Sequence, residues 1–321
     1  MFQNINEDTI NMNNVGEINN EIKEKAKLNI FSNVFSRKNI VIYIVSFMLS
    51  LVGVGGEFSV FSISILGACF ASDIPALGVM AVSLIGNLIK YGANGALEYF
   101  LTALILTISM LIIKPRYNSE RDRNEKIKIG KNIFISTILL QIVKLIISGF
   151  MIYDVLVTIS FSIIATVFYK IFVNSTTVLQ DFTRKQAFSI EELIGASLLL
   201  SIALGAFGDL SIFGVGIKNV LSILIVMVLG WKNGILVGTT SGVTIGVTLG
   251  VITGSEPIMI AAYAISGMLA GILNKFGKIG VVIGFALGNV LLAYVSNGFT
   301  VELIHFKEIL IAFIRTTCSA K

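Results

Sequence analysis

Long apolar stretches separated by short polar turns dominate the chain from residue 39 onward. A membrane-crossing helix needs about 20 mostly apolar residues, because its rise must cover a hydrocarbon layer roughly 30 Å thick. Eleven stretches approach this length. They lie at 39–55, 57–72, 74–91, 95–113, 131–151, 154–173, 191–208, 211–230, 233–253, 256–274 and 278–296. The pattern predicts an all-α, polytopic integral membrane bundle with about ten transmembrane helices.

The composition supports the same class of protein. Hydrophobic residues make up 55% of the 321 residues and charged residues only 13%, and the mean hydropathy is +0.88. An ordinary soluble domain carries about 25% charged residues, which cover its water-facing surface. This chain has too few charges for such a surface, so the composition indicates a multi-pass membrane protein.

The two ends of the chain differ from the apolar middle, which we predict to be a transmembrane domain over 39–298. Residues 1–38 are polar and lack the early apolar core and cleavage site of a signal peptide, which predicts a cytoplasmic tail. Within it, residues 20–36 are compatible with a short helix lying on the membrane or with a disordered segment. Residues 299–321 carry an apolar stripe between charged positions and predict an amphipathic tail or the start of a cytoplasmic linker.

Basic loops set the expected orientation. The linker 114–131 holds seven Lys and Arg against three Asp and Glu, and the N-terminal tail is also basic before the first span. Because Lys and Arg concentrate in cytoplasmic loops, we expect both segments in the cytoplasm, with four spans between them. The linker 174–190 is predicted to be cytoplasmic too, and Ser189 with Glu192 predicts a capping box that opens the next helix.

Five apolar stretches after residue 191 would leave the C-terminus outside, whereas we expect it in the cytoplasm. One stretch would then not cross. The candidates are the glycine-rich stretch 233–253, since such backbone can unwind or re-enter where protein buries it, and the short first pair 39–72.

Seven glycines, hereafter the glycine series, follow one another at a spacing of four. They are Gly230, Gly234, Gly238, Gly242, Gly246, Gly250 and Gly254. Glycine costs about 1 kcal/mol in a helix interior exposed to water, but in lipid small residues let helix backbones pack closely. Positions four apart turn by about 40° each, so the series either contacts several helices in turn or the helix is broken, for example near Thr239–Ser241. We interpret it as an internal packing face; a substrate path and a self-association face are the alternatives.

Ionisable residues inside spans are the default functional candidates in membrane proteins. Lys144 and Lys218 lie deepest within apolar stretches, and neither has an obvious partner in the sequence. We therefore name both as buried polar candidates that pair with a carboxylate or a carbonyl group.

Motifs for catalysis or cofactor binding are absent from the sequence. The single histidine and two widely spaced cysteines form no metal pattern, and no phosphate-binding loop or hydrolase motif occurs. We expect no enzymatic activity, no cofactor and no nucleic-acid binding for this chain. The rival to a structural membrane module is a small-molecule transporter or permease component, in which the glycine series, Lys144 and Lys218 would line a pathway.

The order of features from Glu191 to Gly298 resembles the membrane part of the stage II sporulation protein E family. An acidic helix start (EELIGASLLL) precedes two apolar spans and a glycine-rich span. The segment ISGMLAGILNKFGK and a last glycine-spaced span follow. The long basic loop after four early spans also fits, so the similarity covers about residues 39–298.

The resemblance implies a role that the residues alone do not show. Family members carry about ten N-terminal spans and a cytoplasmic linker that self-associates and meets the tubulin-like division protein. A C-terminal manganese-dependent serine/threonine phosphatase domain of the PP2C type dephosphorylates an anti-anti-sigma factor and so releases the first forespore-specific sigma factor. By this resemblance the chain is a membrane-anchoring and localisation domain at the polar septum, with the bilayer and other septal membrane proteins as partners. It stops at Lys321, and nothing in it matches the metal-binding aspartates of that phosphatase. The chain is therefore expected to be a fragment, a truncated product or a stand-alone membrane module.

Overall fold

The computed structural model describes residues 36–53, 59–72, 74–112, 123–148, 152–181, 188–208, 210–212, 214–253, 257–297 and 304–318. These residues are helical nearly throughout, which confirms the predicted all-α bundle. The sheet structure within them is one antiparallel hairpin of β1 (Ser211–Ile212) and β2 (Val215–Gly216). The predicted span 211–230 is therefore wrong at its start, because this hairpin precedes the helix.

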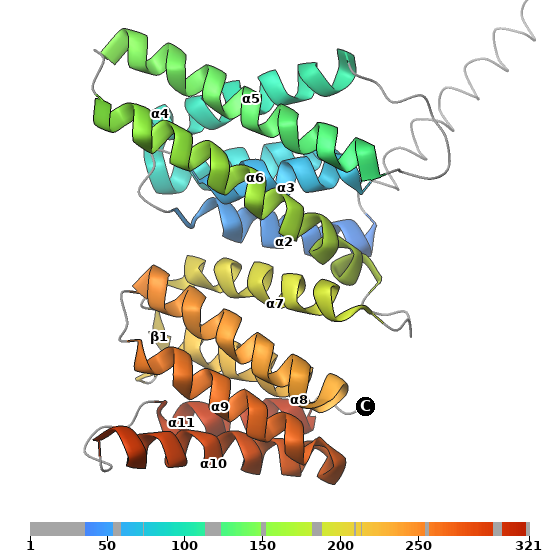
Figure 1. The fold of residues 1–321 in the computed structure, drawn as a ribbon, viewed down its shortest axis with the longest axis vertical. Helices are drawn as coiled ribbons and strands as arrows, with labels where there is room; N and C mark the ends of the chain where they lie inside the picture. Colours follow the sequence, from blue (N-terminus) through green and yellow to red (C-terminus); the bar gives the residue numbers. More distant parts are fainter. Residues whose placement is uncertain are drawn as a thin grey trace, which may run out of the picture.

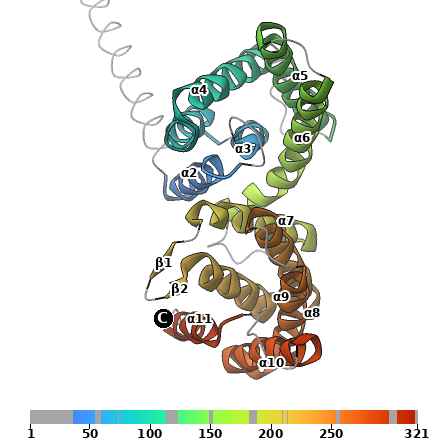
Figure 2. The same cartoon turned by 90° about the vertical axis from the view of Figure 1, so that its left-hand side faces the viewer.

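The N-terminal half wraps several helices around a short central one. Figure 2 shows α3 surrounded by its neighbours, and eleven of its twelve residues are buried. The arrangement explains why a helix too short to span lipid alone is stable here, since protein covers it on all sides. The elements of this half are α2 (Arg37–Ser50), α3 (Val60–Ala71), α4 (Ala76–Ile112), α5 (Arg123–Ser148) and α6 (Ile152–Asp181).

The C-terminal half is a second bundle, and α7 lies between the two halves (Figure 1). Each half has its own cluster of buried apolar side chains, and α7 contributes to the cluster of the first half. The elements from α7 onward are α7 (Ile190–Leu204), η1 (Gly205–Phe207), α8 (Ile217–Thr253), α9 (Ile258–Ile272), η2 (Leu273–Phe276), α10 (Gly277–Asn297) and α11 (Phe306–Cys318).

Three glycines break long helices into hairpins. Gly92 inside α4 has φ 72° and ψ −166°, Gly234 inside α8 has φ 80° and ψ −163°, and Gly277 after η2 has φ 73° and ψ −161°. This region of backbone conformation is essentially restricted to glycine. A lysine stands two positions before each break, where the positive charge suits the carboxyl end of a helix. The predicted break near Thr239–Ser241 is wrong, since the helix continues there and ends its first arm at Gly234.

Length and composition identify six candidate membrane spans in the described part of the chain. Three of them, Ala76–Leu111, Ile217–Gly250 and Ile258–Ser296, contain one of the glycine breaks. Two shorter apolar helices, Asn39–Ser50 and Val60–Ala71, add to them. Counting both arms of each broken helix gives eleven apolar helices, but a total of about ten crossings stays a prediction.

Several predicted boundaries move in the structure. Helix α5 already begins at Arg123, so the basic loop expected over 114–131 is shorter than the sequence suggested. The capping box is confirmed, because Glu192 N–H donates to Ser189 Oγ at 3.2 Å and Ser189 N–H donates to Glu192 Oε2 at 2.8 Å. The N-terminal tail up to residue 35, with its proposed surface helix, lies outside the described residues.

Candidate functional site

The two arms of α8 fold back on each other at the glycine series. A Cβ atom built on Gly230 would lie 3.5 Å from the Cα of Gly238, four residues beyond the break at Gly234, and 3.5 Å from the backbone nitrogen of Gly271 in α9. Residues equally distant from the break are therefore neighbours. The close approach of three backbones is possible here because none of these positions carries a side chain.

Beyond the break, the glycine series packs directly on the backbone of α9. A Cβ on Gly238 would lie 2.5 Å from the carbonyl oxygen of Gly267, and a Cβ on Gly246 would lie 2.7 Å from the Cα of Ile260. A Cβ on Gly242 would overlap the carbonyl oxygen of Tyr263. Rising numbers in α8 meet falling numbers in α9, so the two helices are antiparallel.

Helix α10 covers a second side of α9 in the same manner. Cβ atoms on Gly280, Gly284 and Gly288 would meet the backbone of α9 and η2 at Leu273, Leu269 and Ser266, in that order. Helix α9 is thus held between two glycine faces. Gly250 lies in the described part of α8, whereas Gly254 lies outside the described residues.

Hydroxyl groups beside the glycine series bond mainly within their own helix. Thr244 donates to the carbonyl oxygen of Thr240 at 2.6 Å, and Thr248 donates to that of Thr244 at 2.7 Å. The Thr244 and Ser197 hydroxyls are also 3.1 Å apart, which links α8 to α7 across the boundary between the two halves. Such bonds satisfy the hydroxyls without water.

Lys144 has an ion-pair partner that the sequence did not reveal. Its Nζ lies 2.6 Å from Glu98 Oε1, and the two side chains are 33% and 14% exposed. Glu98 lies six residues after the break at Gly92 and Lys144 lies four residues before the end of α5. The pair therefore lies near one end of the bundle rather than at its centre, which corrects the deep position expected for Lys144.

Lys218 is buried, with 9% of its surface exposed, but it is only the second residue of α8 and not deep within a span. The residues on either side of it in sequence, Gly216 and Asn219, contact Glu308 of α11. Glu308 Oε1 accepts hydrogen bonds from Asn219 Nδ2 at 3.0 Å and from the Gly216 backbone N–H at 3.3 Å. A carboxylate that is 3% exposed thus ties α11 to the start of α8.

A second clamp holds the chain just before α11. Asn289 of α10 donates from Nδ2 to the Ile304 carbonyl oxygen at 2.9 Å and accepts from the Ile304 N–H at 3.2 Å. The amide satisfies both backbone groups of one buried residue, as a neighbouring strand would. Sequence reasoning missed both residues. Asn289 is an uncharged residue inside the last predicted span, and Glu308 lies in a tail segment that also carries other charged residues.

Neither Lys144 nor Lys218 is among the nearest neighbours of the glycine series. Lys144 instead pairs with Glu98. The structure thus separates the candidate residues into a glycine-packed core, an ion pair and a polar clamp. Among the described residues, no group of three or more His, Cys, Asp or Glu side chains could hold a metal ion.

Comparison with known families decides the assignment of the chain. Residues 2–316 match the model described as SpoIIE, N-terminal domain. The chain belongs to the SpoIIE N-terminal domain family. The matching model describes an N-terminal domain. Stage II sporulation protein E of Bacillus subtilis (strain 168) is 28% identical over 146 residues, which is 46% of this chain and 18% of that protein.

The SpoIIE assignment therefore concerns a membrane domain related to sporulation, and the match spans less than a fifth of the Bacillus protein. No solved structure matches the chain. The glycine breaks, the packing of α9 and the contacts of α11 are therefore described from the structure of this chain and not by analogy with a solved structure.

Proposed function

We propose that this SpoIIE N-terminal domain anchors a cytoplasmic phosphatase of the PP2C type in the membrane and positions it at the asymmetric division septum. The observation that carries the proposal is the family match over residues 2–316, nearly the whole chain. The domain itself contributes placement, while catalysis and manganese binding belong to a separate phosphatase domain. Release of the forespore-specific sigma factor is then a consequence of where that phosphatase is held.

The direction of the last helix supports an exit toward the cytoplasm. Helix α11 begins beside the start of α8, where Glu308 and Asn289 hold it. It then runs back, and Figure 1 places the C-terminal label on the side of the bundle where α2 begins. On this proposal α11 supplies the reversal that the parity of the sequence lacks, and a linker leaving α11 starts in the same compartment as the N-terminus.

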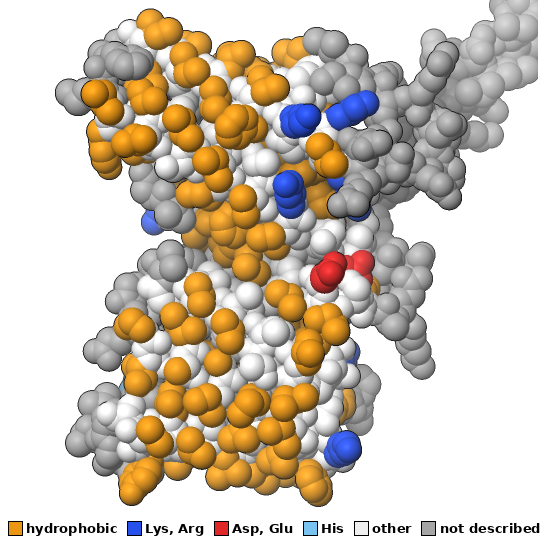
Figure 3. Space-filling view, viewed as in Figure 1, with side chains coloured by type: hydrophobic (Ala, Val, Ile, Leu, Met, Phe, Trp, Pro, Cys, Tyr) orange, Lys and Arg blue, Asp and Glu red, His pale blue; other side chains and the backbone are white. Residues whose placement is uncertain are grey.

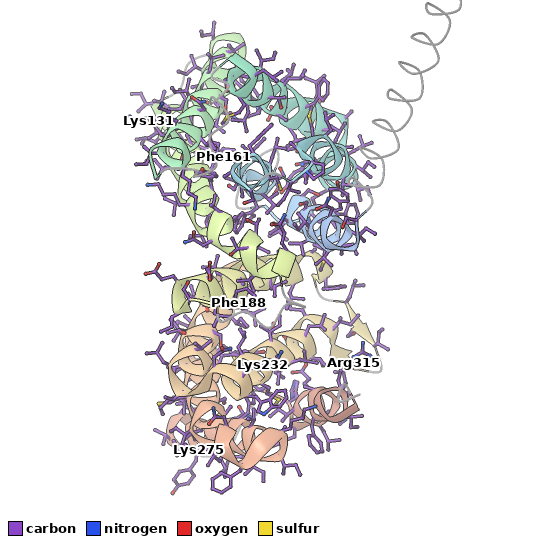
Figure 4. The ribbon with its side chains drawn as sticks, turned by 90° about the vertical axis from the view of Figure 1, so that its right-hand side faces the viewer. Lys131, Phe161, Phe188, Lys232, Lys275 and Arg315 are labelled. Atoms are coloured by element: carbon purple, nitrogen blue, oxygen red, sulfur yellow. The ribbon has the colours of Figure 1, made fainter. Side chains whose placement is uncertain are left out.

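The charges of the described residues support the cytoplasmic assignment of that side. This side of the bundle carries the starts of α5 and α7 and the helix breaks at Gly234 and Gly277. Figure 4 looks at the same side. Figure 4 labels Lys131, Lys232, Lys275 and Arg315 on this side. Lys126 and Lys128 lie near the start of α5, Lys278 follows the break at Gly277, and Lys170 follows Tyr169, which bonds to Lys126. Glu191 and Glu192 are the described carboxylates of this side, so the excess is basic, as cytoplasmic faces of membrane proteins are.

The family resemblance further supports self-association and a meeting with the tubulin-like division protein. We propose that these partners act through the linker beyond α11, while the glycine-packed core keeps the bundle rigid beneath it. The positions of Lys144, paired with Glu98 near one end of the bundle, and of Lys218, at the start of α8, favour this proposal over the transporter alternative.

The test is the location of residues 1–321 fused to a fluorescent protein in sporulating cells. We expect the fusion to concentrate at the polar septum without any phosphatase domain. The control is the same fluorescent protein on an unrelated multi-pass membrane protein, which should label the whole membrane. Uniform labelling by both fusions would contradict a localising role and would leave anchoring alone.

A further inference from the structure

Helices α5 and α6 form an antiparallel pair whose register is fixed near one end. The Tyr169 hydroxyl of α6 donates to the Lys126 carbonyl oxygen of α5 at 2.9 Å. A Cβ built on Gly130 would lie 3.3 Å from Cε1 of Tyr169. Gly130 and Tyr169 therefore face each other at one height along the pair.

The residues that follow these two are both lysines, Lys131 and Lys170, and both are exposed. Each residue advances about 100° around its helix axis. Viewed from one end of the bundle, the two antiparallel helices turn in opposite senses, so Lys131 and Lys170 swing away from the contact toward the same face. This geometry directs two positive side chains, 39 positions apart in the sequence, toward the same face of the helix pair.

An apolar surface continues directly from the two lysines toward the middle of the bundle. Ile135 and Ile142 of α5 lie four and eleven positions after Lys131, on the same side of the helix. Ile163 and Val167 of α6 lie seven and three positions before Lys170. These four side chains are 57%, 45%, 49% and 48% exposed, which is the environment of lipid acyl chains.

No carboxylate among the described residues neutralises the lysine pair. The described acidic side chain of α6 is Asp154, at the opposite end of the helix, and the described ion pair of α5 joins Lys144 to Glu98, also at that end. Lys128 lies three positions before Lys131 and adds a third exposed positive charge. Figure 3 shows Lys and Arg side chains gathered at this end of the upper half of the molecule, beside hydrophobic ones.

We propose that Lys131 and Lys170 bind the headgroup phosphate of an anionic phospholipid, whose acyl chains lie along the apolar stripes of α5 and α6. Two ammonium groups at one height, with no described carboxylate beside them, attract a phosphate, and a basic cluster at the cytoplasmic end of transmembrane helices is suited to anionic lipids. The adjoining stripes favour a lipid over a free phosphate ion, because only a lipid also covers Ile135 and Val167. The site gives the domain a preference for membrane regions rich in anionic lipid.

The experiment measures lipid retention by the whole chain. The protein is extracted from an equimolar mixture of phosphatidylglycerol and phosphatidylcholine and is examined by native mass spectrometry. We expect the wild type to retain phosphatidylglycerol. Lys131→Gln/Lys170→Gln should lose about thirty-fold in that preference, from about fivefold for each lysine near the surface. Lys131→Arg/Lys170→Arg should keep it, since arginine also binds phosphate.

The matched control is Lys232→Gln/Lys275→Gln, which removes the same charge from the same end of the bundle in the other half (Figure 4). We expect this variant to retain phosphatidylglycerol like the wild type. Equal losses in both glutamine variants would overturn the site in favour of diffuse charge. No preference in the wild type, or full competition by inorganic phosphate at matched ionic strength, would overturn the lipid. If the double glutamine variant does not fold, Lys131→Gln is compared with Lys131→Arg, and equal retention by these two overturns the site.

Discussion

Replacing Gly242 by alanine should push α8 and α9 apart. The added Cβ would overlap the carbonyl oxygen of Tyr263 and would also lie 3.1 Å from the Cα of Ala264. These are backbone atoms of a packed helix, so no side chain can rotate out of the way. The helices must separate locally by about 1 Å to restore an ordinary contact distance.

The cost follows from the contacts that such a gap weakens. One pair of apolar atoms contributes about 0.1–0.2 kcal/mol, and a gap of up to about 1 Å forfeits as much as half of it. Many such pairs along this stretch of the interface are weakened together, so we expect a loss within the usual range of about 1–3 kcal/mol for overpacking. The gain in helix propensity from glycine to alanine, about 1 kcal/mol at most, offsets only part of it.

The structure supplies a control within the same glycine series. A Cβ on Gly230 would find its nearest atoms at 3.5 Å, an ordinary contact distance. Reversible unfolding in mixed detergent should therefore show Gly242→Ala less stable than the wild type and Gly230→Ala unchanged or slightly more stable. Gly242→Leu should be worse than Gly242→Ala and should also fail to localise. Equal stability of the two alanine variants would refute the reasoning that close backbone approach, rather than glycine content, sets the stability.

Three further predictions concern polar contacts and the helix breaks. Glu308→Leu should free α11 and speed amide hydrogen exchange over 306–318 by about tenfold or more, since two donors lose their acceptor. Glu308→Gln keeps an acceptor oxygen and should change the exchange rate less. Equal exchange rates in the two variants would contradict the clamp. A double-mutant cycle of Glu98→Gln and Lys144→Met should give a coupling free energy of about 1 kcal/mol in unfolding, which is small because the lysine is one-third exposed. Purely additive losses of stability in the double variant would refute the ion pair. Gly92→Ala should lower the free energy of unfolding by about 1–3 kcal/mol, because the φ of 72° at this position disfavours any side chain. Steric overlap is not the cause, since a Cβ there would meet no atom within 4 Å. An unchanged thermal midpoint would refute backbone strain at Gly92.

Much of the architecture could be read from local sequence. Apolar runs separated by turns predict membrane helices because lipid leaves the backbone no partner outside its own helix. The capping box at Ser189 and Glu192 was equally predictable, since both of its hydrogen bonds lie within four residues. The spacing of the glycine series indicated close helix packing, although its partner helix could not be named.

What the sequence left open was decided by contacts between distant segments. The members of the glycine series look alike in sequence, yet Gly234 alone among its described members takes a positive φ, because α9 must pack on both arms of the hairpin. Lys144 appeared unpaired because Glu98 lies 46 positions earlier on another helix. Glu308 and Asn289 gained their roles only when α11 folded back onto α8 and α10. Local sequence fixes which segments are helices, whereas the close approach of backbones in the folded bundle determines where those helices break and which polar groups meet.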